Sequence, residues 1–63
     1  MSYAPAIFQY RNRAEAIRAI RARTVEPGIR RLLDDVADDY EMLADILNRI
    51  DMTQAVIAKH LPL

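Results

Sequence analysis

The chain has 63 residues, no cysteine and a formal net charge of zero, with 52% hydrophobic and 29% charged residues. This length allows one thin domain, and the missing cysteines exclude disulfides and thiolate metal sites. The sequence holds no run of about 18 apolar residues, so it predicts no membrane-spanning segment. Its beginning lacks the pattern of a secretory signal, and we therefore expect a cytoplasmic protein.

The zero net charge hides an uneven distribution. Residues 1–31 carry seven arginines and two glutamates, whereas residues 32–63 carry seven carboxylates against one arginine and one lysine. The first half is therefore basic and the second half acidic. We interpret this polarity as a basic helix that packs against an acidic one.

The first predicted helix covers residues 5–23, because Pro5 suits a first helical turn and no breaker follows before Arg23. Its apolar residues recur at helical spacing and share one face. This predicted face consists of Ala6, Ile7, Tyr10, Ala14, Ile17 and Ile20.

A turn is predicted at residues 24–28, where Thr-Val-Glu-Pro-Gly interrupts the helical pattern. Alternatively, Pro27 occupies the first position of the second helix, with Glu26 beside the positive end of its dipole. In either case the connection is about five residues long. Such a short connection predicts that the two helices are antiparallel neighbours.

The second predicted helix covers residues 29–50 and has the clearest periodicity in the chain. Its apolar residues recur at alternating steps of three and four, as on one helix face. They are Ile29, Leu32, Leu33, Val36, Tyr40, Leu43, Leu47 and Ile50.

The apolar pattern weakens after Ile50. Asp51 and Gln54 resemble a capping pair, which predicts a break followed by a short helix over residues 52–60. A single helix that runs on to His60 is the alternative. The apolar residues of the short helix are Val56, Ile57 and Leu61, and Pro62 ends it.

The sequence therefore predicts an all-α fold: one domain over residues 1–63, formed by an antiparallel helical hairpin and a short C-terminal helix. Packing the two long helices together predicts three ion pairs. They are Arg18–Asp34, Arg13–Asp39 and Arg11–Glu41. Arg13 projects among apolar residues, so it needs a carboxylate such as Asp39 or must extend along its own stem to water.

The second helix is apolar over about half of its circumference, more than one neighbouring helix covers. An exposed patch of this kind marks an interface. We expect a homodimer or higher homo-oligomer in which two hairpins complete a four-helix bundle, with a larger protein client on the same face as the alternative. The predicted interface residues are Tyr10, Ile17, Leu33, Tyr40, Leu43, Leu47 and Ile50.

The strings YRNRAEAIRAI and LLDDVADDYEMLA, with Thr24, Pro27 and Arg30 between them, resemble a group of short bacterial helical-hairpin proteins common in alphaproteobacteria. The resemblance covers about residues 10–44 and implies a bacterial source and a hairpin fold. It implies no activity. The matching residues are Tyr10, Arg11, Arg13, Ala14, Thr24, Pro27, Arg30, Leu33, Ala37, Tyr40, Glu41, Leu43 and Ala44.

Residues suited to chemistry are few. Asp34, Asp38, Glu41 and Asp45 share a helix face and offer oxygens to a hard cation, but we interpret them as a solvated acidic face beside basic neighbours. His60 is the only histidine, at the end of the last predicted helix. We therefore predict no enzyme and no catalytic, cofactor or metal site.

The function predicted from the sequence is protein–protein interaction through self-association, with a role as an adaptor or regulatory partner of a larger protein as its extension. The alternative is a small nucleic-acid-binding protein whose basic strip contacts phosphates. That strip consists of Arg11, Arg18, Arg21, Arg30 and Arg31. The neutral chain and the nearby carboxylates make this alternative the weaker one. A membrane-surface helix is disfavoured because the second helix is acidic.

Overall fold

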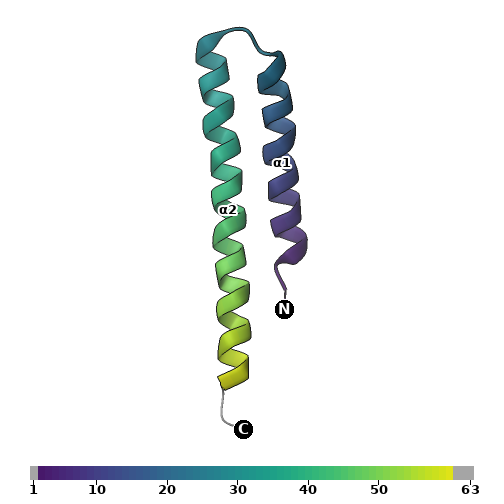
Figure 1. Ribbon diagram of the computed structural model, residues 1–63, viewed down its shortest axis with the longest axis vertical. Coiled ribbons are helices and arrows are strands. Elements are labelled where there is room, and N and C mark those ends of the chain that lie inside the picture. Colours follow the sequence, from purple (N-terminus) through teal and green to yellow (C-terminus); the bar gives the residue numbers. More distant parts are fainter. Residues whose placement is uncertain (1, 61–63) are drawn as a thin grey trace.

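The structure is a computed structural model that describes residues 2–60. Two helices, α1 (Ala4–Arg23) and α2 (Pro27–His60), form an antiparallel hairpin 58 Å long, 16 Å wide and 10 Å deep (Figure 1). No strand occurs within residues 2–60. The all-α hairpin predicted from the sequence is confirmed. Leu61 and Pro62, which the sequence analysis assigned to the end of the last helix, lie outside the described residues.

The connection between the helices is three residues long, and its two ends are capped by its own side chains. The Thr24 hydroxyl donates to the Ile20 carbonyl at 2.8 Å, where α1 ends. The Glu26 carboxylate accepts hydrogen bonds from the N–H groups of Gly28 (3.0 Å) and Ile29 (2.6 Å). These groups have no partner within the first turn of a helix, so Glu26 satisfies them and fixes the start of α2. The alternative that placed Pro27 at the first position of α2 is confirmed.

The start of α1 is capped by the other helix. Tyr3 occupies the cap position without a side-chain hydrogen bond of its own, but its N–H lies 3.0 Å from both carboxylate oxygens of Asp51 on α2. The Ser2 hydroxyl donates to Asp51 at 3.4 Å and accepts the Ala4 N–H at 3.1 Å. A carboxylate at the positive end of a helix is favourable, so Asp51 ties the beginning of α1 to α2.

The prediction of a break after Ile50 is wrong, because α2 continues without interruption to His60. The alternative of one long helix is the one observed. Asp51, which the sequence suggested as the cap of a new helix, instead caps α1 through Tyr3. No Gly or Pro follows Gly28 within the described part of α2, so nothing in the backbone favours a break.

The helices meet along a line of residues that we call the seam. Its members are buried or half-buried and recur at alternating steps of three and four in both helices. This is the repeat of coiled-coil packing, in which each helix inserts its side chains between those of the other. The seam consists of Ile7, Tyr10, Ala14, Ile17 and Arg21 of α1, with Tyr3 and Thr24 at its two ends, and Arg30, Leu33, Ala37, Tyr40, Ala44, Leu47 and Asp51 of α2.

Alanine occupies the most buried positions of the seam. Ala14, Ala37 and Ala44 are completely inaccessible to solvent, and Ile7 is the one larger residue that is buried among those described. Small side chains allow two helix backbones to approach closely, but each of them removes little apolar area from water. The ring of Tyr10 stacks on that of Tyr40 with 5.9 Å between centroids, and this pair supplies much of the apolar bulk in the seam.

Arginines of α1 pair with carboxylates of α2 as predicted, but the register of the predicted pairs is wrong. Arg11 pairs with Asp45 (3.5 Å), and Arg18 pairs with both Asp38 (3.3 Å) and Glu41 (3.1 Å). Asp45 and Asp38 lie about one turn further along α2 than the predicted partners, and Glu41 lies about two turns further than the partner predicted for Arg18. The reason is that helix side chains point back toward the N-terminus of their own helix, which for α1 is toward the C-terminal end of α2.

Candidate interaction surface

Six large apolar side chains of α2 lie outside the seam, on a surface that we call the outer face. It consists of Ile29, Leu32, Val36, Leu43, Ile46 and Ile50. Leu32 is 64% exposed and Leu43 is 42% exposed, although both belong to the apolar periodicity that identified the helix. The hairpin therefore buries three alanines and Ile7, and leaves these six branched aliphatic residues of α2 largely in contact with water.

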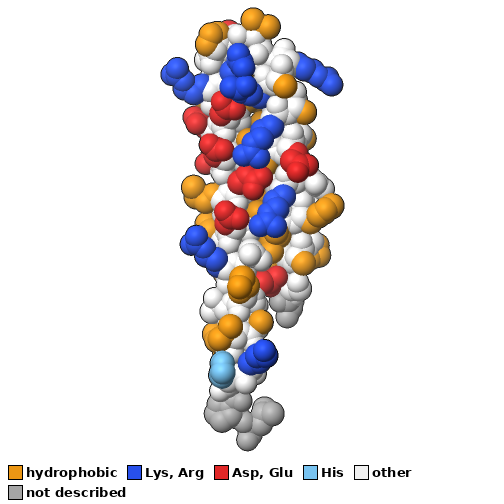
Figure 2. Space-filling model, in the orientation of Figure 1, with side chains coloured by type: hydrophobic (Ala, Val, Ile, Leu, Met, Phe, Trp, Pro, Cys, Tyr) orange, Lys and Arg blue, Asp and Glu red, His pale blue; other side chains and the backbone are white. Residues whose placement is uncertain are grey.

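The outer face and the acidic residues of α2 lie on opposite sides of the seam. At 3.6 residues per turn, Val36 and Leu43 are rotated by about a quarter turn from Ala37 and Ala44 in one direction. Asp38 and Asp45 are rotated from the same alanines by a similar angle in the other direction. The charged side shows arginines and carboxylates interleaved along the hairpin (Figure 2). One flank of the hairpin is thus closed by ion pairs, while the other exposes the outer face.

The seven predicted interface residues divide between the two surfaces. The structure places five of them in the seam, half-buried between α1 and α2. Leu43 and Ile50 belong to the outer face, at 42% and 38% exposed. The five in the seam are Tyr10, Ile17, Leu33, Tyr40 and Leu47. Their contact with a second copy stays a prediction, and their contact with the other helix of the same chain is observed.

Ile20 does not take part in the face predicted for α1. Its side chain is 55% exposed, whereas Arg21 occupies the next seam position and is half-buried. The straight-helix wheel misplaced Ile20 because a heptad repeat drifts by about 20° per seven residues against the ideal helix. The aliphatic stem of Arg21 covers part of the seam, and its Nε lies 3.0 Å from Asp34 as an ion pair rather than an aligned hydrogen bond.

Arg13 finds an aromatic ring instead of the predicted carboxylate. Its guanidinium carbon lies 5.9 Å from the centre of the Tyr40 ring, which is stacked on Tyr10. This contact is a cation–π interaction at the edge of the seam. The predicted Arg13–Asp39 pair is absent from the ion pairs among residues 2–60, because the exposed Arg13 keeps its charge in water and packs on Tyr40.

The arginines predicted to bind phosphate are distributed along one side and the turn. Arg11, Arg18 and Arg21 are held by carboxylates of α2. Hydrogen bonding to Glu41 raises the pKa of Arg18, which keeps its positive charge fixed. Arg30 and Arg31 lie with Arg21 and Asp34 around a shallow hollow at the turn. Three of the five arginines are therefore already neutralised by neighbours.

The acidic side of α2 is occupied by the same ion pairs. Asp34, Asp38, Glu41 and Asp45 each contact an arginine of α1. No group of three metal-binding side chains occurs in the part of the chain that the structure describes. His60 is exposed at the last position of α2.

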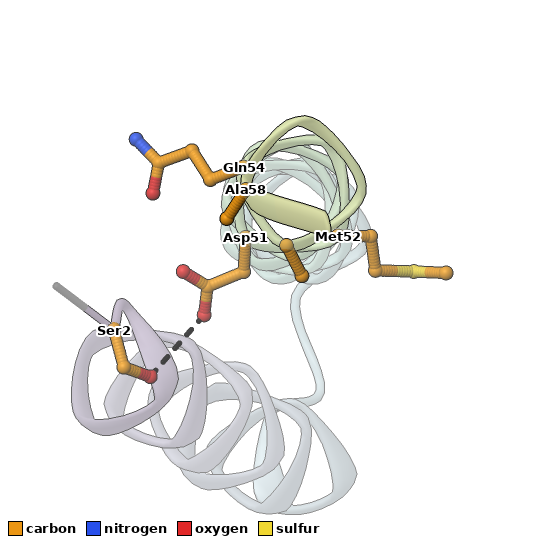
Figure 3. Close-up of a pocket in the computed structure, with 6 residues that line it drawn as sticks. Ser2, Asp51, Met52, Gln54 and Ala58 are labelled. Carbon is orange, nitrogen blue, oxygen red and sulfur yellow. Dashed lines mark hydrogen bonds between the residues drawn. The ribbon is translucent and has the colours of Figure 1, made fainter. Parts of the chain in front are cut away.

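Beyond Asp51, α2 extends past the start of α1, and we call residues 52–60 the overhang. At 1.5 Å per residue this segment is about 14 Å long. Asp51 points across to Ser2 at the step where α1 begins, while Met52 points away from it (Figure 3). Val56 and Ile57 on the overhang are more than half exposed, with no α1 residue beside them to cover them.

Sequence reasoning missed one feature of this surface. The role of Asp51 depends on a contact between residues 48 positions apart, which no local pattern predicts. The signal for the outer face was present in the exact seven-residue spacing of Ile29, Val36 and Leu43, which the wider stripe obscured.

Comparison with protein-family models, curated protein sequences and solved structures found no match to this chain. The resemblance to short bacterial helical-hairpin proteins therefore stays a prediction. Neither α1 nor the described length of α2 has a stretch apolar enough to cross a bilayer.

Proposed function

We propose that this chain is a non-enzymatic interaction protein that self-associates through the outer face, so that two hairpins complete a four-helix bundle. The bacterial, cytoplasmic setting expected from the sequence belongs to the same proposal. Action as an adaptor or regulator of a larger protein is its extension, through surfaces that the dimer leaves free.

The observation that carries this proposal is the exposure of the outer face. Leu32, Val36 and Leu43 lie in water on a helix whose opposite flank is closed by ion pairs. Contiguous exposed apolar side chains of this kind mark an interaction surface. A second copy offers the same surface, and a two-fold dimer brings a patch onto itself.

The amount of exposed surface supports the same conclusion. The chain exposes 5221 Å², whereas a compact monomer of 7.2 kDa exposes about 4,100 Å². The difference of about 1,100 Å² is comparable to the roughly 800 Å² that each partner buries in a stable interface. An elongated hairpin therefore has enough surplus surface for one such contact.

The test is a pair of matched substitutions measured by sedimentation equilibrium. Leu43→Asp places a charge at the centre of the outer face, and we expect it to weaken self-association by at least about 100-fold. Phe8→Asp is the control, because Phe8 is 67% exposed on α1 outside the outer face. We expect Phe8→Asp to retain the mass of the wild-type dimer.

A wild-type chain that stays monomeric up to millimolar concentration contradicts the proposal. Loss of the dimer in both variants shows that the contact lies elsewhere. A monomer that captures a larger protein, with capture lost in Leu43→Asp only, assigns the outer face to a client instead of a second copy.

The nucleic-acid alternative has less support, because Arg11, Arg18 and Arg21 are paired with carboxylates. Phosphate binding has to break these pairs before it gains new ones. Retention on immobilised heparin above about 0.3 M salt would favour this alternative, since several phosphate contacts give a steep salt dependence.

A further inference from the structure

We propose that the outer face pairs antiparallel with the same face of a second copy, with Leu43 beside the two-fold axis. This inference rests on the proposed self-association and adds the orientation of the two chains. It also gives the overhang a defined neighbour, which the isolated hairpin does not provide.

The spacing of the exposed aliphatic residues has its own symmetry. Ile29, Val36, Leu43, Ile50 and Ile57 recur every seven residues, and all five are exposed. Reversing α2 about Leu43 superposes this set on itself. Ile29 then faces Ile57 of the second copy, and Val36 faces Ile50, so each residue of this set of five meets an aliphatic partner.

A parallel dimer also aligns these residues, so the charges beside them decide the orientation. Asp35, Asp39 and Arg49 flank the outer face and are exposed. None of them belongs to an ion pair within residues 2–60, in contrast to the carboxylates on the other flank. Their charges are therefore available to a partner.

The two orientations treat these charges differently. In a parallel two-fold dimer the same flank of each copy lies on opposite sides of the contact, so Arg49 of one copy does not meet Asp35 or Asp39 of the other. In the antiparallel dimer Arg49 of one copy falls between Asp35 and Asp39 of the other, within about two residues of each. Opposite charges that meet across an interface favour the orientation that pairs them, which here is the antiparallel one.

The overhang supplies the second argument. Ile57 lies beyond the beginning of α1, so no residue of α1 covers it. In the antiparallel dimer it lies beside Ile29 of the second copy, near the turn. The two α2 helices then overlap along their entire described length of 34 residues, about 50 Å.

Disulfide trapping tests the orientation without disturbing native thiols, since the chain has no cysteine. Ile29→Cys and Ile57→Cys are prepared separately, one of them labelled with nitrogen-15, and are mixed and oxidised with glutathione. We expect the mixed disulfide to exceed either self-disulfide by at least tenfold. Glu15→Cys, exposed on α1, is the control for random collision and is expected to remain largely monomeric.

A charge exchange provides an independent measurement that needs no cysteine. In the antiparallel dimer Arg49→Glu faces two carboxylates, so we expect its dissociation constant to rise about tenfold. The triple variant Asp35→Arg, Asp39→Arg and Arg49→Glu restores opposite charges and returns the constant to within about threefold of wild type. The same titrations in 1 M salt show how much of each change is electrostatic.

The outcomes separate this inference from the proposed function. A wild-type chain that stays monomeric overturns both. A wild-type dimer in which Ile29→Cys and Ile57→Cys form self-disulfides is parallel and overturns only the orientation. An unchanged dissociation constant for Arg49→Glu overturns it as well, because only the antiparallel dimer brings Arg49 beside Asp35 and Asp39.

Discussion

The seam and the outer face of α2 are both apolar, yet they contain different residues. Ala37 and Ala44 face α1 and are completely buried, while their neighbours Val36 and Leu43 remain exposed. Small residues give the hairpin a close and well-defined contact, but a fully buried large aliphatic side chain contributes about 1.5 to 3 kcal/mol, much more than a methyl group does. Much of the apolar driving force in this sequence therefore lies outside the hairpin, where a second molecule can use it.

The largest effect is expected at the seam, where Ala44→Asp places a charge at a completely buried position. A charge there has no partner and no water, so it costs more than about 3 kcal/mol. A domain of this size has only about 3 to 9 kcal/mol of stability in total. We expect the helical circular dichroism at 222 nm to be lost at 25 °C.

Ala16→Asp is the control for that experiment, because Ala16 is exposed on α1. It introduces the same charge and the same loss of helix propensity without burial. A variant Ala44→Asp that melts like Ala16→Asp would mean that the alanine seam does not hold the hairpin together.

Asp51 tests how much the open end of the seam contributes to stability, at the position beyond which α2 extends past α1. Asp51→Ala removes the carboxylate that accepts the Tyr3 N–H, and loss of a helix cap costs about 1 kcal/mol. For a domain of this size we expect the melting temperature to fall by roughly 4 to 8 °C. Glu15→Ala, exposed and outside all ion pairs among the described residues, is expected to melt close to wild type.

Glu26 is the corresponding helix cap at the turn end of the hairpin, and its contribution to stability depends on pH. Hydrogen bonds from the N–H groups of Gly28 and then Ile29 lower the pKa of Glu26 below its ordinary 4.5. The charged form is thus favoured by folding, so its stabilisation is complete above the ordinary pKa and is lost as pH falls through the lowered one. We expect Glu26→Gln to melt below wild type at pH 7.

Acid melting curves check this assignment. The difference between wild type and Glu26→Gln is expected to shrink as the pH is lowered from 6 to 3, because the wild-type carboxyl becomes protonated. A difference that stays constant over this range would show that Glu26 does not act through its charge.

The smallest effect is expected on the ion-paired flank. Arg11 and Asp45 are about half exposed and 3.5 Å apart, and such surface pairs contribute roughly 0 to 1 kcal/mol. Arg11→Gln should therefore change the free energy of unfolding by less than about 1 kcal/mol, and 1 M salt should remove the difference. Arg23→Gln, on an exposed arginine outside the described ion pairs, is the matched control in the same urea titrations.

The sequence predicted the features that depend on local patterns. The two helices, the turn and the role of Pro27 follow from periodicity and from proline and glycine chemistry. The sequence did not predict which apolar residues of α2 belong to the seam and which belong to the outer face. Periodicity shows how wide the apolar face is, but not which part of it contacts α1. Ala37 and Ala44 carry weak hydropathy signals and yet determine where the helices touch.

The sequence also did not predict the features that depend on contacts between residues far apart along the chain. The register of the ion pairs depends on the tilt of long arginine side chains, and the straight-helix comparison of Arg18 with Asp34 ignored this tilt. Asp51 looked like a local cap because the cap that it forms belongs to the other helix.

The three-residue connection between α1 and α2 also implies an order of assembly. Contacts beside the turn, such as that between Arg21 and Asp34, close a short loop, whereas Tyr3 and Asp51 lie 48 positions apart. Closure entropy grows with the logarithm of loop length, so the distant contact costs roughly 1 kcal/mol more unless nearer ones have already formed. The hairpin should therefore zip from its turn toward its open end, and fluctuations of the native state should unzip it in the reverse order.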